Sequence, residues 1–342
     1  MKKILMGLVL CCCLILSGCG GKSESDIVKD LSKKIEKTNS YYLSGQMEII
    51  NNEDTYTYDV KVGYKTGDFY RVELKNIANN HEQVILRNED GVYVITPSLN
   101  KSFKFQSDWP YNNSQVYLLG SLINDLNNDN EKIFTEVDDG YTFTTSVNYP
   151  NNLKLVKQVI YLNKNLDITQ VQVLDNEDNL QISMVFDKID LGSQFNDDYF
   201  DLNQILKVKE ENTENSEDES TAEDTKQTAT LEDIIYPMYL PNNTYLTNQE
   251  KVDKEQGERL ILTFDGDSPF MLIEETVVTE DEHVIIPTYG DLEFLASTVA
   301  VVNDNSVNWI DNNIEYYVIS DVLSKNELLN IARSISVIPV SK

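Results

Sequence analysis

The feature that most constrains the fold of this 342-residue chain is a run in which every second residue is apolar or aromatic. The run consists of Tyr56, Tyr58, Val60, Val62 and Tyr64, with polar or small residues at the positions between them. Successive side chains of a β-strand point to opposite faces of a sheet, so this alternation predicts a strand with one apolar face. A chain built from such strands needs other elements to cover that face.

The same alternation recurs further along the chain. It returns at Tyr70, Val72 and Leu74, directly after a turn over 66–68. Further strands are predicted at 83–87, 92–96, 102–106, 141–146, 156–162, 168–174 and 180–186. Dipeptides such as Asp90-Gly91 and Asp139-Gly140 separate these segments, as they do in hairpins. The sequence therefore predicts a long antiparallel meander.

Two segments of this region show helical spacing instead. The first covers 26–38 and has its apolar residues at Ile27, Leu31 and Ile35. The second follows the Trp109-Pro110-Tyr111 turn, and its apolar stripe consists of Val116, Leu119, Leu122, Ile123 and Leu126. We expect the sheet to curl around these two helices.

The space between the sheet and the helices has two interpretations. It is either a packed core, which is the default, or an open apolar cavity. The candidate lining residues of such a cavity are Tyr56, Tyr58, Val60, Val62, Tyr64, Leu119, Leu122 and Ile123. Periodicity alone does not decide between a core and a cavity.

All four cysteines lie within the first nineteen residues. Two lysines, an apolar run over 4–16 and the segment Leu16-Ser17-Gly18-Cys19 resemble the signal of bacterial lipoproteins. The resemblance implies a signal peptide at 1–18, a diacylglyceryl thioether on Cys19 and a short tether at 19–25. The protein is then expected at the extracytoplasmic face of the cell membrane, lipid-anchored. The alternative is an ordinary secretory signal with an incidental cysteine.

The charge balance excludes some partners. The formal net charge is −29, so nucleic acid would repel the chain.

The segment 207–230 holds eight acidic residues, three lysines and no aromatic side chain, which predicts an extended acidic linker. We therefore expect one domain at 26–206 and a second at 231–342.

The second domain is predicted to be a small α+β unit. Strands are indicated at 260–264 and 270–275, and a hairpin at 307–317 is expected to bury Trp309. Ser324 and Glu327 have the spacing of a capping box, which predicts the start of a helix carrying Leu328, Ile331 and Ala332 on its inner face. The overall fold class is therefore α+β.

The order of these elements resembles a known superfamily. A helix, paired strands, the segment 87–97, a central helix and hairpins ending in Phe200-Asp201-Leu202 resemble the lipoprotein-carrier, or LolA-like, superfamily. The resemblance implies an incomplete antiparallel barrel closed by helices, with an apolar concavity for acyl chains. The second domain resembles the small C-terminal domain of sporulation lipoproteins and anti-sigma regulators. The whole chain most resembles sporulation or germination lipoproteins of Gram-positive spore formers.

Catalytic and cofactor motifs are sparse. His81 and His283, the two histidines, fall in different predicted domains, and the chain has no Gly-x-Ser-x-Gly elbow, phosphate loop or His-Glu-x-x-His helix. We therefore expect neither an enzyme nor a cofactor.

One weak metal pattern is present. Asp125, Asn127, Asp129 and Glu136 have the spacing of calcium-loop ligands. Asn130 stands where such a loop needs glycine and Lys132 where it needs an apolar residue. A polar loop at the end of the central helix is the favoured interpretation.

Two classes of function remain. The first is a membrane-anchored, non-enzymatic binding or regulatory protein that holds a protein partner. The resemblance makes a cell-wall hydrolase such as an amidase, or a signalling protein, a plausible partner. The second is a lipid or lipoprotein handler with an acyl-chain ligand in the barrel cavity. A firm anchor favours the first class, because a shuttle has to leave its membrane.

Overall fold

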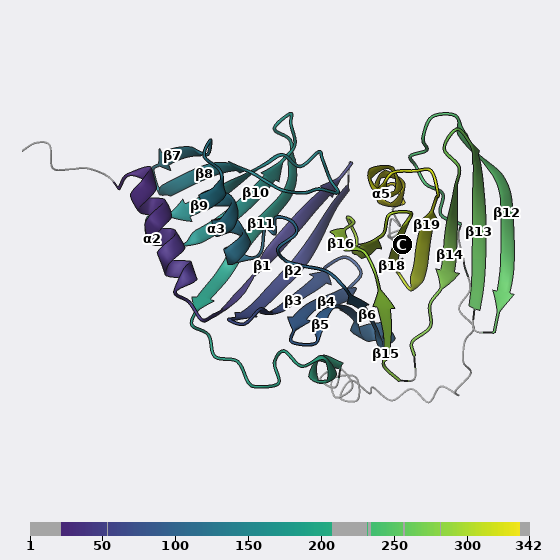
Figure 1. Cartoon of the computed structure of the whole chain (residues 1–342), viewed down its shortest axis with the longest axis horizontal. Helices are drawn as coiled ribbons and strands as arrows, with labels where there is room; N and C mark the ends of the chain where they lie inside the picture. The colour runs from purple at the N-terminus through teal and green to yellow at the C-terminus, as the bar shows by residue number, and fades with distance from the viewer. Residues whose placement is uncertain are drawn as a thin grey trace, which may run out of the picture.

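The computed structural model describes residues 22–52, 54–206, 231, 234–255, 257–280 and 282–335. Two β-sheets stand side by side along the molecule, and α2 (Glu24–Glu36) lies at the end furthest from β12 (Thr244–Lys254) (Figure 1). The predicted signal peptide (1–18), Cys19 and the predicted linker (207–230) lie outside the described residues. In the described part of the chain, no helix combines the length and the apolar character needed to cross a membrane.

The first sheet has twelve strands in the order β15-β6-β5-β4-β3-β2-β1-β11-β10-β9-β8-β7. Its strands are β1 (Ser40–Asn51), β2 (Asp54–Lys65), β3 (Phe69–Asn76), β4 (Glu82–Asn88), β5 (Gly91–Thr96), β6 (Lys101–Phe105), β7 (Ile133–Val137), β8 (Gly140–Ser146), β9 (Lys157–Asn163), β10 (Ile168–Leu174), β11 (Leu180–Leu191) and β15 (Val284–Thr288). A short 3-10 helix, η1 (Pro97–Leu99), joins β5 to β6. Every neighbouring pair is antiparallel except β15 and β6, so most of the predicted meander is confirmed.

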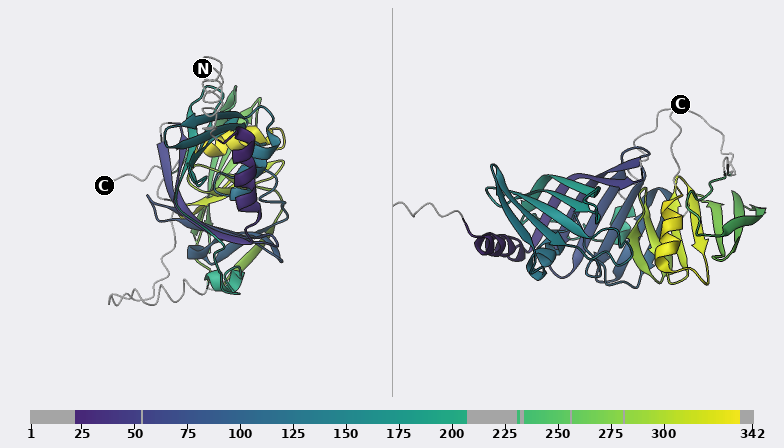
Figure 2. Two further views of the ribbon diagram at one scale, coloured as in Figure 1. Left: turned by 90° about the vertical axis from the view of Figure 1, so that its left-hand side faces the viewer. Right: turned by 90° about the horizontal axis from the view of Figure 1, so that it is seen from above.

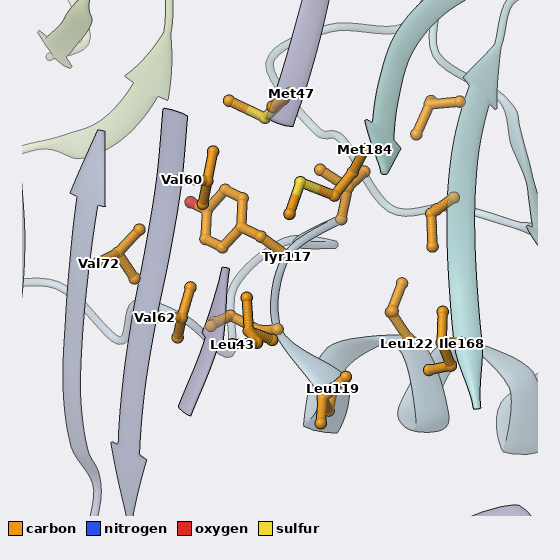
Figure 3. Close-up of a cluster of buried hydrophobic side chains, with 14 of the residues drawn as sticks. Leu43, Met47, Val60, Val62, Val72, Tyr117, Leu119, Leu122, Ile168 and Met184 are labelled. Atoms are coloured by element: carbon orange, nitrogen blue, oxygen red, sulfur yellow. The ribbon is translucent and has the colours of Figure 1, made fainter. Parts of the chain in front are cut away.

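Helices α2 and α3 (Leu119–Asn128) cover the concave face of this sheet (Figure 2). Ser23 caps α2 by accepting the N–H of Asp26 on its hydroxyl, and Ile27 and Leu31 face inward. Figure 3 shows side chains of α3 and the strands meeting in this core, with Tyr117 pointing toward Val60. The predicted fold class is confirmed. The structure is a curved, open antiparallel sheet whose concave face is covered by helices, with a smaller α+β unit beside it.

Strand β1 was not among the predicted strands, although it lies at the centre of the sheet order. Every second residue from Tyr41 to Ile49 is buried, but one of these buried positions holds a glycine, Gly45, in place of an apolar side chain. A Cβ atom at this position would lie 2.1 Å from the backbone oxygen of Val185 on β11, where the register of the two strands shifts. This close approach of the two backbones requires glycine at position 45. Because glycine has no side chain, the apolar alternation of β1 is broken in the sequence.

The second sheet has seven strands in the order β12-β13-β14-β19-β18-β17-β16, and α5 (Lys325–Arg333) packs on it. Its other strands are β13 (Gly257–Gly266), β14 (Phe270–Thr276), β16 (Asp291–Phe294), β17 (Val299–Val302), β18 (Ser306–Asp311) and β19 (Ile314–Ile319). The predicted hairpin is confirmed, because β18 pairs with β19 and Trp309 stacks on Tyr316 with ring centroids 5.1 Å apart. The capping box of Ser324 and Glu327 is also present at the start of α5.

Strand β15 links the two sheets. The chain leaves β14 of the second sheet, pairs in parallel with β6 of the first sheet and returns to β16. The register places Val284 opposite Lys101 and Thr288 opposite Phe105. We refer to residues 26–206 as the N-terminal domain and to the described residues from 231 onward as the C-terminal domain, with β15 as the C-terminal domain's strand in the first sheet.

Candidate functional site

The interdomain interface contains buried, well-defined hydrogen bonds. The hydroxyl of Tyr58 on β2 donates to the backbone oxygen of Ala296 at 2.7 Å. The side-chain oxygen of Gln83 on β4 accepts the hydroxyl of Thr298 at 3.0 Å and the N–H of Val299 at 2.8 Å. Removing a partner from such a buried bond leaves a desolvated polar group, so these contacts fix one arrangement of the two domains.

A buried ion pair within the C-terminal domain lies at the interface, at the end of α5. Arg333 donates to the carboxylate of Glu293 at 3.0 Å, and the two side chains are 17% and 7% exposed. Burial raises the pKa of Glu293, while the guanidinium of Arg333 and the side-chain amide of Asn151 oppose that rise. The backbone oxygen of Arg333 accepts the side-chain amide of Asn51 from β1 at 2.8 Å. The C-terminal end of α5 is therefore bound to the N-terminal domain.

A pocket of about 430 Å³ opens beside this ion pair, and we call it the interdomain pocket. Its apolar lining includes Met47, Ile49, Val116, Tyr117, Leu155, Ile182, Phe294 and Ala296. Its polar lining includes Asn51, Asn52, Asn113, Gln115, Asn152, Asn176, Gln181, Asn330, Lys154, Asp175, Glu177, Glu293 and Arg333. The pocket's volume lies within the range of small-molecule sites, and its lining mixes apolar and polar side chains.

The eight residues named as possible cavity lining lie in or against the helix-covered core. Tyr58, Val60, Val62, Leu119, Leu122 and Ile123 are at most 4% exposed, and Tyr56 and Tyr64 pack against the same cluster. None of the eight lines the interdomain pocket. The residues that do line it come mostly from strand ends and loops, where no periodic pattern marks them.

A smaller apolar crevice of about 210 Å³ lies between α2, α3 and the strands β10 and β11. Its lining includes Leu31, Ile35, Leu119, Ile168 and Leu191. Lys34 and Asp167 also line it, and their charged groups form an ion pair of 2.6 Å. Of the predicted cavity residues, Leu119 is the one that contributes to this crevice.

The four candidate calcium ligands each have a separate protein partner. Asp125 and Asn127 lie within α3, where Asp125 accepts from Gln158 at 3.0 Å and Asn127 accepts from Ser32 at 3.2 Å. Asp129 accepts the N–H of Ser146 at 2.7 Å, and Glu136 on β7 pairs with Lys164 at 3.0 Å. Among the described residues, no three acidic, histidine or cysteine side chains form a group that could hold a metal ion.

Two further acids of the C-terminal domain, Glu274 and Asp311, are buried. Burial raises the pKa of Glu274 on β14 to about 7, although its carboxylate accepts the N–H of Ile235 at 3.1 Å. Burial likewise raises the pKa of Asp311 on β18 to about 6. Such groups make stability depend on pH near neutrality.

A serine and a histidine also meet across the interdomain interface. The hydroxyl of Ser102 on β6 lies 3.0 Å from Nε2 of His283, just before β15. Ser102 is 0% exposed, so its hydroxyl is not accessible to a substrate in this structure. We therefore interpret this contact as a bond that holds β15 in place. The other histidine, His81, lies just before β4 in the N-terminal domain and does not take part in this contact.

Three solved structures overlap with this chain at low similarity. The MucA/MucB complex of Pseudomonas aeruginosa matches with 12% identity over 89% of this chain and 98% of that one, with a TM-score of 0.30. The structure of the CwlD amidase from Clostridioides difficile in complex with the GerS lipoprotein matches with 18% identity over 52% and 98%, and a TM-score of 0.30. A LolA superfamily protein from Nitrosomonas europaea matches with 11% identity over 54% and 100%, and a TM-score of 0.32. At these TM-scores, the overlaps carry no argument about function.

Sequence similarity is much stronger. Sporulation protein YdcC of Bacillus subtilis strain 168 is 35% identical over 340 residues, which cover 98% of each chain. The model of the family described as sporulation protein YdcC-like matches residues 1–200. The predicted resemblance to sporulation proteins of Gram-positive spore formers is thereby confirmed at the level of the family. The chain belongs to the YdcC-like sporulation protein family.

Proposed function

We propose that the protein is a non-enzymatic, membrane-anchored binding protein of the sporulating cell, held through Cys19 at the extracytoplasmic face, and that it holds a protein partner in the interdomain pocket. The family supports a role in sporulation, since the Bacillus subtilis relative is a sporulation protein. The predicted lipoprotein signal at 16–19 supports the anchor. A cell-wall amidase or a membrane signalling protein is the class of partner that we propose.

The observation that carries the proposal is the interdomain pocket. Its walls come from both domains, and the interdomain bonds of Tyr58, Gln83 and Asn51 hold those walls in one arrangement. A pre-formed site avoids the cost of ordering itself when a partner binds. Amide side chains around the pocket both donate and accept hydrogen bonds, which suits the backbone of a partner segment.

The proposed partner is tested by capture from sporulating cells. Residues 20–342 are immobilised, and captured proteins are identified by mass spectrometry. A variant that fills the mouth of the pocket, Lys154→Trp with Asn176→Trp, is expected to lose the partner. A control with two tryptophans on a remote exposed surface, Lys188→Trp with Asn203→Trp, is expected to keep it. Equal capture by both variants would exclude the pocket as the binding site.

The proposed anchor is tested separately. Cys19→Ser is expected to move the protein from the membrane fraction to the soluble extracytoplasmic fraction, because the acylated thiol is lost. Unchanged membrane fractionation of this variant would contradict the lipid anchor and would leave the pocket experiment unaffected.

The crevice under α2 favours a second candidate function, which is binding of an acyl chain. Its apolar lining and volume of about 210 Å³ fit part of such a chain, and the Lys34–Asp167 pair supplies a polar group beside it. Native mass spectrometry of residues 20–342 is expected to detect a bound lipid, and Ile168→Trp is expected to remove it. Recovery of lipid without any protein partner would overturn the partner-holding proposal.

A further inference from the structure

Strand β12 presents a long open edge at one end of the molecule. It is an edge strand of the second sheet (Figure 1). It is eleven residues long, and all of its residues except Thr244 are exposed. The opposite edge strand of the same sheet, β16, differs, because its residues Leu292 and Glu293 are buried. An exposed edge strand offers unpaired backbone N–H and C=O groups to another strand.

The second half of β12 has a charge pattern that is complementary to itself. The order Glu250-Lys251-Val252-Asp253-Lys254 reads acid, base, apolar, acid, base. If two copies of β12 pair in antiparallel register about Val252, Lys251 of each copy lies opposite Asp253 of the other. In the same register, Glu250 of each copy lies opposite Lys254 of the other. Every charged residue of this segment then faces the opposite charge across the pair.

The orientation of the side chains agrees with this register. On β13, Leu260 is opposite Lys251 and Glu258 is opposite Asp253, so Lys251 and Asp253 share one face of the sheet. By the same alternation, Glu250, Val252 and Lys254 share the other face. A two-fold axis perpendicular to the sheet keeps each face continuous, as residues paired across antiparallel strands require.

The contacts within one chain leave two of these acids available. Lys251 pairs with Glu258 on β13 at 2.8 Å and Lys254 pairs with Glu275 on β14, so in the proposed pair each lysine would be shared between its own acid and the acid of a second copy. Asp253 lies opposite Glu258, which is a like charge, and neither Asp253 nor Glu250 is among the described ion pairs of this strand. A second copy would bring Lys251 and Lys254 to these two acids. Opposite charges across paired strands contribute roughly 0.2–1 kcal/mol each.

We propose that two copies of this chain associate through antiparallel pairing of β12 with β12, centred on Val252, so that the two second sheets become one. The contact is small, because only the five-residue segment 250–254 pairs fully. It is therefore a weak association in dilute solution, and confinement of both copies to one membrane would raise its effective concentration. The proposal goes beyond the partner-holding function and does not depend on it.

A single cysteine at the two-fold axis tests the register. Residues 20–342 contain no cysteine, so Val252→Cys introduces a single thiol. Directly opposite residues of an antiparallel pair have Cα atoms about 4.5–5.5 Å apart, which is within the range of a disulfide. Under mild oxidation, Val252→Cys is expected to form a cross-linked dimer at least ten times faster than Tyr245→Cys, which is exposed on the same strand. Equal cross-linking rates for the two variants would overturn the proposal.

A charge exchange tests the self-complementarity independently of the thiol. In the Val252→Cys background, Asp253→Lys alone places lysine opposite lysine and is expected to slow cross-linking several-fold. Adding Lys251→Asp restores opposite charges in both pairs and is expected to restore most of the rate. Circular dichroism of each variant reports whether the fold is kept. If the second substitution fails to recover cross-linking in a folded protein, the register is wrong, and pairing of β12 with a different protein's strand becomes the explanation of its open edge.

Discussion

The helix-covered core and the interdomain interface are held together by different chemistry. The core packs aliphatic and aromatic side chains such as Leu43, Val62 and Leu122, which are fully buried and have no polar atom to satisfy. The interface also buries Gln83, Glu293 and Arg333, and each of these needs a particular partner. Apolar packing tolerates several arrangements, whereas a buried polar group penalises every arrangement that leaves it unpaired. The core therefore supplies most of the stability, and the interface specifies how the domains are joined.

The largest effect is expected in the core. Leu122→Ala removes a fully buried side chain of α3 and is expected to lower the free energy of unfolding by about 4 kcal/mol, independently of pH. Urea denaturation of residues 20–342 measures it. The control Leu153→Ala, at a side chain that is 71% exposed, is expected to change the free energy little. A small loss at Leu122 would mean that the core is loosely packed.

The next effect is expected at the buried ion pair. Arg333→Met leaves the carboxylate of Glu293 buried without its cation and is expected to cost about 3 kcal/mol of unfolding free energy at pH 8. At acidic pH the loss should shrink, because burial raises the pKa of Glu293, so that the carboxyl takes up a proton and its charge disappears.

The double variant Arg333→Met with Glu293→Leu is the control for that pair. Removing both charges is expected to recover most of the stability at pH 8. If Arg333→Met costs the same at every pH and the double variant recovers nothing, the side chain of Arg333 acts through packing, and the proposed contrast between core and interface fails at this position.

A smaller effect is expected from Glu274. Its folded pKa of about 7 lies above that of an exposed glutamate, so the native state binds the proton more tightly than the unfolded chain does. Stability contributed by this group is therefore present at low pH and lost as the pH rises through 7. Glu274→Gln is expected to reduce the gain in unfolding free energy between pH 8 and pH 5 by about 2 kcal/mol. Urea denaturation at the two pH values measures this, and an unchanged pH dependence would contradict it.

The smallest effect is expected from a single hydroxyl. Tyr58→Phe removes the 2.7 Å bond to the backbone oxygen of Ala296 and is expected to lower the unfolding free energy by about 1 kcal/mol. Tyr245→Phe, at an exposed tyrosine, is the control and should be neutral. A difference of less than about 0.3 kcal/mol between the two variants is roughly the scatter of such measurements. It would show that water replaces this interdomain bond at no cost.

The same contrast explains what the sequence could predict. Alternation at 56–64 and helical spacing at 26–38 predicted their elements, because one apolar face repeats with the period of a strand or a helix. The capping box of Ser324 and Glu327 could be predicted equally well, because the two residues are only three positions apart in the sequence. These are local patterns, and the curved sheet with its covering helices follows from them.

The interface lacked any such pattern. Gln83 and Val299 are far apart in the sequence, and a buried glutamine looks the same as an exposed one until the fold is known. The pairing of β15 with β6 joins residues 284–288 to 101–105 by backbone bonds, which no side-chain periodicity records. The calcium spacing at 125–136 shows the reverse case, in which a local pattern is present while each residue bonds a different neighbour.

The position of β15 also bears on how the chain can be made. Residues 284–288 cover the edge of β6, and they are synthesised long after the rest of the first sheet. Until they arrive, β6 is an open edge available to other nascent chains, and a fragment that ends at residue 206 keeps that edge permanently. Solubility of the N-terminal half therefore depends on the C-terminal domain. Truncation after residue 288 would in turn remove β19 and open the edge of β14, so truncation for expression should be avoided.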